Sequence, residues 1–163
     1  MAFENFQKHC RNCKKGEPCG KPHLYVLELK DSILSRKDWK NIDERYVEGK
    51  DCLYVGYSNH LPKCRASVHE NWIPGPFVEA RIGKTYLCYC SGEMKPKPYT
   101  KKTRASTTVF PDNKFTLKRS LFRHHNPIKD NEDPEEKEGE LAEKLRDLGY
   151  AVWAGHHDST FRN

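Results

Sequence analysis

The chain has 163 residues, of which 32% are charged and 36% are hydrophobic, and its formal net charge is +6. This length suits one domain with a modest core. No apolar run approaches the roughly 20 residues that a membrane-spanning helix needs, and the first six residues lack the basic-then-apolar order of a signal peptide. We therefore expect a cytoplasmic protein without a membrane role. The positive charge suits a polyanionic partner, although charge alone discriminates weakly.

The first 23 residues are rich in cysteine, histidine, glycine and proline. The whole chain holds seven cysteines, an odd number that argues against a disulfide framework in a cytoplasmic protein. A Cys-x-x-Cys pair has the spacing with which two thiolates bind one zinc ion, and glycines and prolines supply the tight turns of a zinc knuckle. We predict a structural zinc ion here, against the alternative of a tail with free thiols. The predicted ligands are Cys10, Cys13, Cys19 and either His23 or His9.

Two segments that carry a tyrosine have the composition of strands. They are residues 23–29, with Tyr25 near the start, and residues 52–58, with Tyr54 between two aliphatic side chains. Aromatic and β-branched residues of this kind favour a pleated, half-buried strand. We expect Gly56 to end the second strand, because glycine suits a sharp turn or a close approach of backbone.

A short helix is predicted directly after the second strand. Ser58 and Asn59 can cap it, Pro62 suits its first turn, and the following residues can continue it. Arg65 and His69 are four positions apart, so both would project from one helix face. The strand and the helix would then direct a guanidinium group and an imidazole to the same place. The alternative is a solvated helix face.

The middle of the chain combines strand patterns with positive charge. Residues 77–82 and 85–90 alternate like strands, and Gly83 with Lys84 would form the hairpin turn between them. The segment 91–125 then carries nine positive and two negative side chains with aromatic residues interspersed. This mixture is typical of a surface that follows phosphates, and a solvated loop is the alternative. The candidate nucleic-acid contacts are Lys97, Lys101, Lys102, Arg104, Lys118 and Arg119.

A helix is predicted from Pro134 onwards, with acidic residues in its first turn and an apolar face that includes Leu141 and Leu148. Glu138 precedes Leu141 by three positions and lies on that apolar face. A carboxylate at the edge of the core is costly unless a partner such as a metal ion compensates it. Gly149 would end this helix, and residues 150–153 would form a final strand.

In this order, two tyrosine strands, an Arg-x-x-x-His helix and a later helix with a glutamate resemble the GIY-YIG nuclease superfamily. The first motif is residues 23–25, with His23 in place of the glycine, and the second is residues 54–56. The chain also looks like small GIY-YIG-like proteins that end in Glu-x-Glu-Leu-Ala and Gly-Tyr-Ala-Val-Trp, here residues 138–142 and 149–153. The connection before the second motif is long, and no residue matches the asparagine that often closes the family's pattern.

The resemblance implies an α+β fold, with a small antiparallel sheet flanked by helices, and hydrolysis of DNA phosphodiester bonds with one Mg²⁺ or Mn²⁺ ion. Tyr25 or Tyr54 would help to deprotonate the attacking water, and Arg65 would stabilise the charge that builds on the phosphate. His69 would hydrogen-bond the nucleophile or the phosphate. Glu138 would hold the divalent ion.

We accordingly divide the chain into a zinc-binding-like segment, 1–23, and a GIY-YIG-like domain, 24–163, that includes the basic insert 91–125. DNA is the expected partner, with RNA as an alternative, and the protein would act as a monomer or a homodimer. Two other classes of function compete with the nuclease. One is a non-catalytic, zinc-containing nucleic-acid-binding module, and the other is a zinc-stabilised protein-interaction domain.

Overall fold

The computed structural model describes residues 10–13, 19–29, 34, 44–59, 62 and 116–155, together with the backbone of two strands at 85–88 and 95–98. The predicted helix after Pro62 and the predicted strand at residues 77–82 lie outside these residues. So do the residues of the basic insert between 99 and 115. Every structural statement below concerns the described part of the chain.

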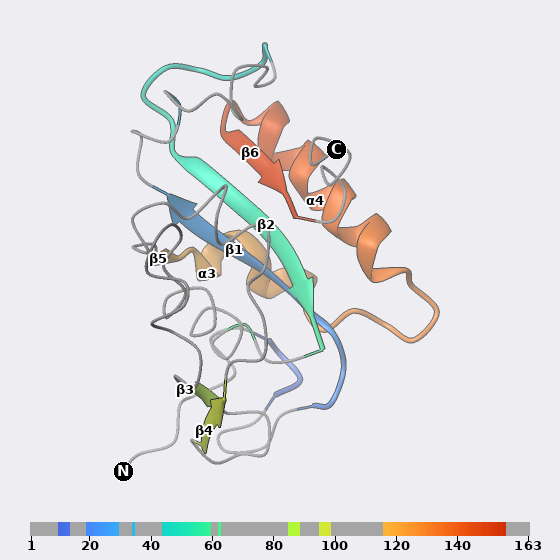
Figure 1. The fold of residues 1–163 in the computed structure, drawn as a ribbon. Helices are drawn as coiled ribbons and strands as arrows, with labels where there is room; N and C mark the ends of the chain where they lie inside the picture. Colours follow the sequence, from blue (N-terminus) through green and yellow to red (C-terminus); the bar gives the residue numbers. More distant parts are fainter. Residues whose placement is uncertain are drawn as a thin grey trace, which may run out of the picture.

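A four-stranded mixed sheet forms the centre of the fold, with the strand order β5-β1-β2-β6 (Figure 1). Its strands are β1 (His23–Leu29), β2 (Cys52–Ser58), β5 (Thr116–Leu117) and β6 (Ala151–Ala154). β1 pairs antiparallel with β2 and with β5, a strand that the sequence did not predict, whereas β2 pairs parallel with β6. The expected antiparallel sheet is therefore found only in part, because β6 makes the sheet mixed. The helix that precedes β6 carries the chain back across the sheet. The chain then enters β6 in the same direction as β2, so the two neighbouring strands are parallel.

β2 does not end at Gly56, contrary to the prediction, but continues to Ser58. Gly56 lies opposite Tyr25 in the β1–β2 ladder. A Cβ atom at Gly56 would lie only 2.5 Å from the hydroxyl oxygen of Tyr25 and 2.6 Å from its ring. The glycine is therefore needed for the close approach of a tyrosine ring rather than for a turn.

The helix α4 (Pro134–Asp147) confirms the sequence-based prediction and packs against β6, β2 and β1 (Figure 1). The carboxylate of Asp133 caps its first turn by accepting a hydrogen bond from the Glu135 amide at 3.0 Å. Gly149 follows the helix with φ at +94°, a left-handed conformation that favours glycine. Leu148 is 60% exposed, so its predicted place on the core-facing stripe is wrong. Leu148 is the C-cap residue, directly after the last residue of the helix.

The last residues of the basic insert contain helical structure that the sequence did not predict. The helix α3 (Arg119–Phe122) and the 3-10 helix η6 (Arg123–His125) follow β5 and pack against β1. Phe122 is fully buried, and burying a side chain of this size stabilises the fold by about 1.5–3 kcal/mol.

A separate antiparallel pair is formed by β3 (Thr85–Cys88) and β4 (Lys95–Pro98).

The core lies between the sheet and the helices that pack on it. Leu24, Val26 and Leu53 from the sheet, with Leu141 and Leu145 from α4, belong to one cluster of buried residues. Within the described residues, none of the helices has the length and apolarity required to cross a membrane.

Candidate metal centre and candidate active site

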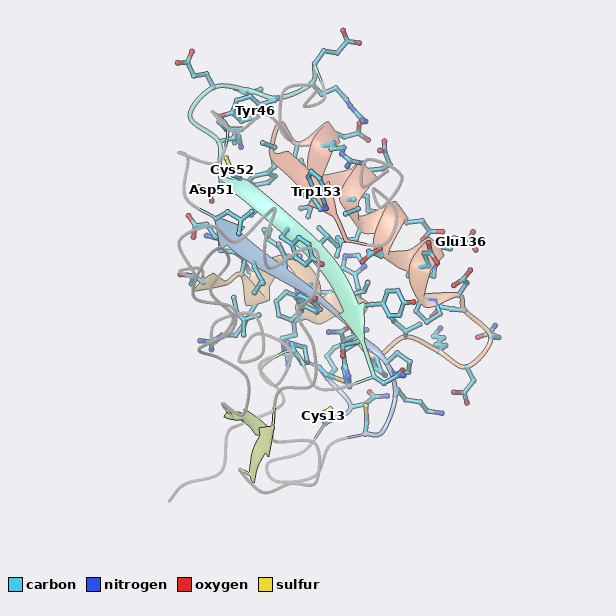
Figure 2. All side chains as sticks on the ribbon, viewed as in Figure 1. Cys13, Tyr46, Asp51, Cys52, Glu136 and Trp153 are labelled. Atoms are coloured by element: carbon cyan, nitrogen blue, oxygen red, sulfur yellow. The ribbon has the colours of Figure 1, made fainter. Side chains whose placement is uncertain are left out.

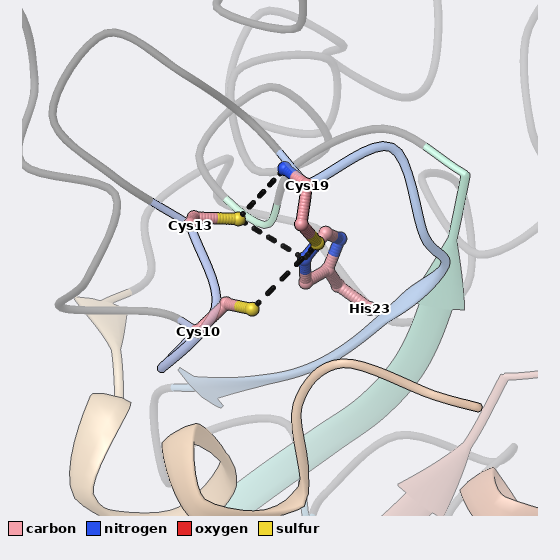
Figure 3. A group of neighbouring side chains, drawn as sticks. All are labelled: Cys10, Cys13, Cys19 and His23. Atoms are coloured by element: carbon pink, nitrogen blue, oxygen red, sulfur yellow. Dashed lines mark hydrogen bonds between the residues drawn. The ribbon is translucent and has the colours of Figure 1, made fainter.

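Three cysteines and one histidine converge at the N-terminal end of β1 (Figure 3). Their ligand atoms all lie within 4.8 Å of one another, and this group consists of Cys10, Cys13, Cys19 and His23. Cys10, Cys13 and His23 are buried, and Cys19 is partly exposed. His23 is at once the first residue of β1 and a member of the cluster, and His9 lies outside the described residues.

The spacing of the cluster matches a tetrahedral zinc site. The sulfurs of Cys10 and Cys19 are 3.9 Å apart, and Nε2 of His23 lies 3.5 Å from the Cys13 sulfur and 3.3 Å from the Cys19 sulfur. A tetrahedral ion with Zn–S bonds of about 2.3 Å places two sulfurs about 3.8 Å apart. The amide of Cys19 also donates to the Cys13 sulfur at 3.3 Å. Soft sulfur and imidazole donors in this arrangement fit zinc and could hold such an ion.

The protonation of the three thiols is uneven. A hydrogen bond from Cys13, with help from His23, lowers the pKa of Cys10 to about 4. The same bond to Cys10, together with burial, raises the pKa of Cys13, and burial raises that of Cys19. Cys10 therefore loses its proton more readily than Cys13 and Cys19, and metal binding must displace the protons that the thiols retain.

Contacts with the segment before α4 fix the cluster to the domain. The side chain of Arg11 donates to the backbone oxygen of His124 at 3.3 Å, and the amide of Ile128 donates to the backbone oxygen of Pro22 at 3.0 Å. Lys21 forms an ion pair with Asp130 at 2.7 Å. The N-terminal segment thus packs on residues that lie more than 100 positions away in the sequence.

Asn126 connects the cluster to the strand that carries Tyr25. Its side chain accepts a hydrogen bond from the amide of Leu24 at 2.7 Å and donates one to the backbone oxygen of Leu24 at 2.8 Å. The amide group of Asn126 therefore pairs with β1 as a neighbouring strand would. The backbone amide and carbonyl oxygen of Leu24 are buried, and each has a hydrogen-bond partner. Asn126 therefore fixes the part of β1 that lies between the metal centre and Tyr25.

A second group of polar side chains gathers on β1, β2 and α4. Tyr25 and Tyr54 have ring centroids 6.1 Å apart, and both rings are buried. Glu138 of α4 is fully buried, whereas Glu136 lies on the outer side of the same helix (Figure 2). The sequence-based prediction that Glu138 lies on the core-facing stripe is confirmed.

Gly155, directly after β6, is the point where Tyr54 and Glu138 meet. A Cβ atom at Gly155 would collide with the hydroxyl oxygen of Tyr54 and would lie 3.2 Å from Oε1 of Glu138. The two side chains therefore share the space above one glycine. The structure brings together Tyr25, Tyr54 and Glu138 from the predicted site, and Arg65 and His69 lie outside the described residues.

Tyr57 and Gly155 border this group but were not singled out from the sequence. Burial, followed by the charges of Glu135, Glu138 and Asp133, raises the pKa of Tyr57, so its phenol keeps its proton. Its place three residues after Tyr54 was visible in the sequence. The approach of the acidic first turn of α4 was not, because it depends on the packing of the helix.

Two of the predicted nucleic-acid contacts have described side chains. Lys118 lies 3.5 Å from a carboxylate oxygen of Glu28 and 3.6 Å from one of Asp51. Burial opposes its positive charge, but these two carboxylates outweigh the burial and raise the pKa of Lys118. Its charge therefore already has partners within the sheet. Arg119 is exposed at the start of α3.

The other predicted contacts stay predictions. The side chain of Lys97 in β4 is not described, and Lys101, Lys102 and Arg104 lie outside the described residues. No family model, curated protein or solved structure matches this chain. Arguments about function therefore depend on the two sites themselves.

Proposed function

We propose that this protein is a metal-dependent endonuclease of the GIY-YIG type that hydrolyses DNA phosphodiester bonds and carries a structural zinc ion. The observation that supports this proposal most is the meeting of the Tyr54 hydroxyl and the buried Glu138 carboxylate above Gly155. A buried carboxylate beside a phenol is a costly arrangement for a purely structural role. The same arrangement suits a catalytic site at which a proton is transferred beside a bound cation.

The donor chemistry at Glu138 fits Mg²⁺ or Mn²⁺, which take one or two hard carboxylate ligands and complete their shell with water and substrate phosphate. Such an ion supplies charge that stabilises the oxygens of the phosphate during displacement. In this proposal Tyr54, whose hydroxyl approaches Gly155 together with Glu138, would accept or pass on a proton through its hydroxyl oxygen. Tyr57 retains its proton and can serve as a hydrogen-bond donor.

The zinc ion has a structural role in this proposal. Four protein donors complete the tetrahedral shell and leave no position for a substrate or a catalytic water. Its ligands would be Cys10, Cys13, Cys19 and His23, and the ion would hold the N-terminal segment against the start of β1.

A non-catalytic, zinc-containing nucleic-acid-binding module is the second candidate, and one observation favours it. Tyr25, Tyr54 and Glu138 are each at most 3% exposed, whereas a catalytic metal and a phosphate must reach these groups. His23 also takes the place of the glycine of the first motif, and it belongs to the metal centre. A core that has lost activity would tolerate both features.

The deciding experiment compares Glu138→Gln with Glu136→Gln in cleavage of supercoiled plasmid with Mg²⁺, Mn²⁺ or EDTA. Both variants remove one negative charge from α4, but only Glu138 belongs to the buried group. We expect Glu138→Gln to reduce cleavage by at least about 100-fold and Glu136→Gln to retain it. Equal activity of the two variants would remove Glu138 from the mechanism. Absence of cleavage by the folded, zinc-loaded wild type would favour the binding module.

A further inference from the structure

A cavity of about 440 Å³ lies where the N-terminal segment, η6 and α4 meet. Four cationic side chains line it: Arg11, Lys129, Lys137 and Lys144. Two buried leucines, Leu24 and Leu141, also line it. None of Tyr25, Tyr54 and Glu138 is among its lining residues, so the cavity is distinct from the candidate active site.

The two carboxylates of the cavity share one lysine as their ion-pair partner. Lys137 lies 3.0 Å from Glu132 and 3.0 Å from Glu140, and its bonds to Glu140 and Glu132 raise the pKa of Lys137 to about 12. Glu132 also accepts a hydrogen bond from the amide of Lys129 at 3.0 Å. Four cations against two carboxylates leave an excess of two positive charges, and Arg11, Lys129 and Lys144 form no ion pair within the described part of the chain.

The histidines at the cavity indicate that its electrostatic potential is positive. His124 and His125 both line it. Partial burial, followed by the positive charges of Lys144, His124 and Lys137, lowers the pKa of His125. Cations that disfavour a further positive charge at this position favour an anion there. The ring N–H groups of the two histidines can also donate hydrogen bonds.

The metal centre positions one wall of the cavity. Arg11 lies between the predicted ligands Cys10 and Cys13, and one of its nitrogens donates to the backbone oxygen of His124 at 3.3 Å. A guanidinium group has five N–H donors in a rigid fork, so donors remain for a ligand. This fork matches the geometry of phosphate oxygens.

We propose that this cavity binds a phosphate group, contacted by Arg11, Lys129 and Lys144 with the two histidines at its edge. The phosphate belongs either to a nucleic-acid backbone or to a free phosphate compound such as a mononucleotide. The site goes beyond the proposed nuclease and does not depend on it, because no cleavage is needed for binding. In the nucleic-acid case it adds a contact at α4, next to the last residues of the basic insert.

The test is a binding titration of the full, zinc-loaded chain with inorganic phosphate, a mononucleotide and a short DNA duplex at low salt. The variants are Lys144→Gln, the double variant Lys129→Gln/Lys144→Gln, and Lys50→Gln as a matched control. Lys50 is exposed, contacts the Tyr150 ring and does not line the cavity. We expect about threefold weaker binding for Lys144→Gln, roughly tenfold for the double variant, and no comparable loss for Lys50→Gln.

A second readout is the pKa of His125, followed by NMR with and without phosphate. Bound phosphate should raise this pKa, because a negative charge offsets the neighbouring cations. Weaker binding of the duplex by the double variant would assign the site to a nucleic-acid backbone. A loss confined to phosphate and the mononucleotide would assign it to a free phosphate compound. Unchanged binding of all three ligands by the double variant, or an unchanged His125 pKa at saturation, would overturn the proposal.

Discussion

The metal centre and the candidate active site share β1, where His23 and Tyr25 lie two residues apart, yet they are built differently. The four members of the metal centre lie within 14 consecutive residues, 10–23. Tyr25, Tyr54, Glu138 and Gly155 come from three strands or strand ends and one helix. A site of the first kind depends on short loops and an ion, and a site of the second kind depends on the packing of the domain.

The largest difference between the two sites should follow the loss of a metal ligand. Cys13→Ser should abolish stoichiometric zinc binding and lower the stability of the N-terminal segment by several kcal/mol, since zinc binding contributes directly to folding. Elemental analysis and thermal unfolding measure the two effects. Cys52→Ala is the control, because Cys52 is also buried but lies in β2 outside the cluster. Full zinc content in Cys13→Ser would contradict the assignment of this ligand.

The metal centre should also depend on pH in a predictable direction. The pKa values of Cys13 and Cys19 are raised and that of Cys10 is lowered, so two protons must leave the thiols when zinc binds near neutral pH. Zinc affinity should therefore rise with pH by about 100-fold per unit, at tenfold for each displaced proton. Competition with a chromophoric chelator at two pH values measures this slope. An affinity that does not change with pH would contradict the uneven protonation.

Asn126 tests whether the two sites are coupled. Asn126→Ala removes two hydrogen bonds and leaves the buried amide and oxygen of Leu24 without these partners, which should cost about 2–4 kcal/mol of unfolding free energy. Because Leu24 lies between His23 and Tyr25, both zinc affinity and the packing of Tyr25 should change. Chemical denaturation and tyrosine NMR signals measure these effects. A change in neither would show that the sites are independent.

Gly56→Ala should affect the candidate active site alone. The added Cβ would lie 2.5 Å from the Tyr25 hydroxyl oxygen, and the rigid ring must move, at a cost of about 1–3 kcal/mol. Zinc content should remain that of the wild type. Gly49→Ala is a useful comparison, because an added Cβ meets nothing within 4 Å there and only the backbone at φ +92° is strained. A loss of zinc from Gly56→Ala would mean that β1 transmits the disturbance to the metal centre.

The sequence alone determined the features that depend on neighbouring residues. The spacing of Cys10, Cys13 and Cys19 predicted a cluster that could hold zinc, and the pattern of polar and apolar residues predicted α4 with Glu138 facing the core. The two tyrosine strands were also found, because aromatic and β-branched residues favour extended structure over a few positions. In each case the physical cause acts within one or two turns or one strand.

Only the tertiary structure decided the features that depend on distant partners. The parallel pairing of β2 with β6 follows from the path of the chain through α4. The continuation of β2 past Gly56 follows from the ring of Tyr25 opposite it. His23 joins the metal centre because the N-terminal segment packs on residues 124–130, and Tyr54 meets Glu138 because a glycine directly follows β6. Such contacts join residues across 30 to more than 100 positions, and no local preference in the sequence specifies them.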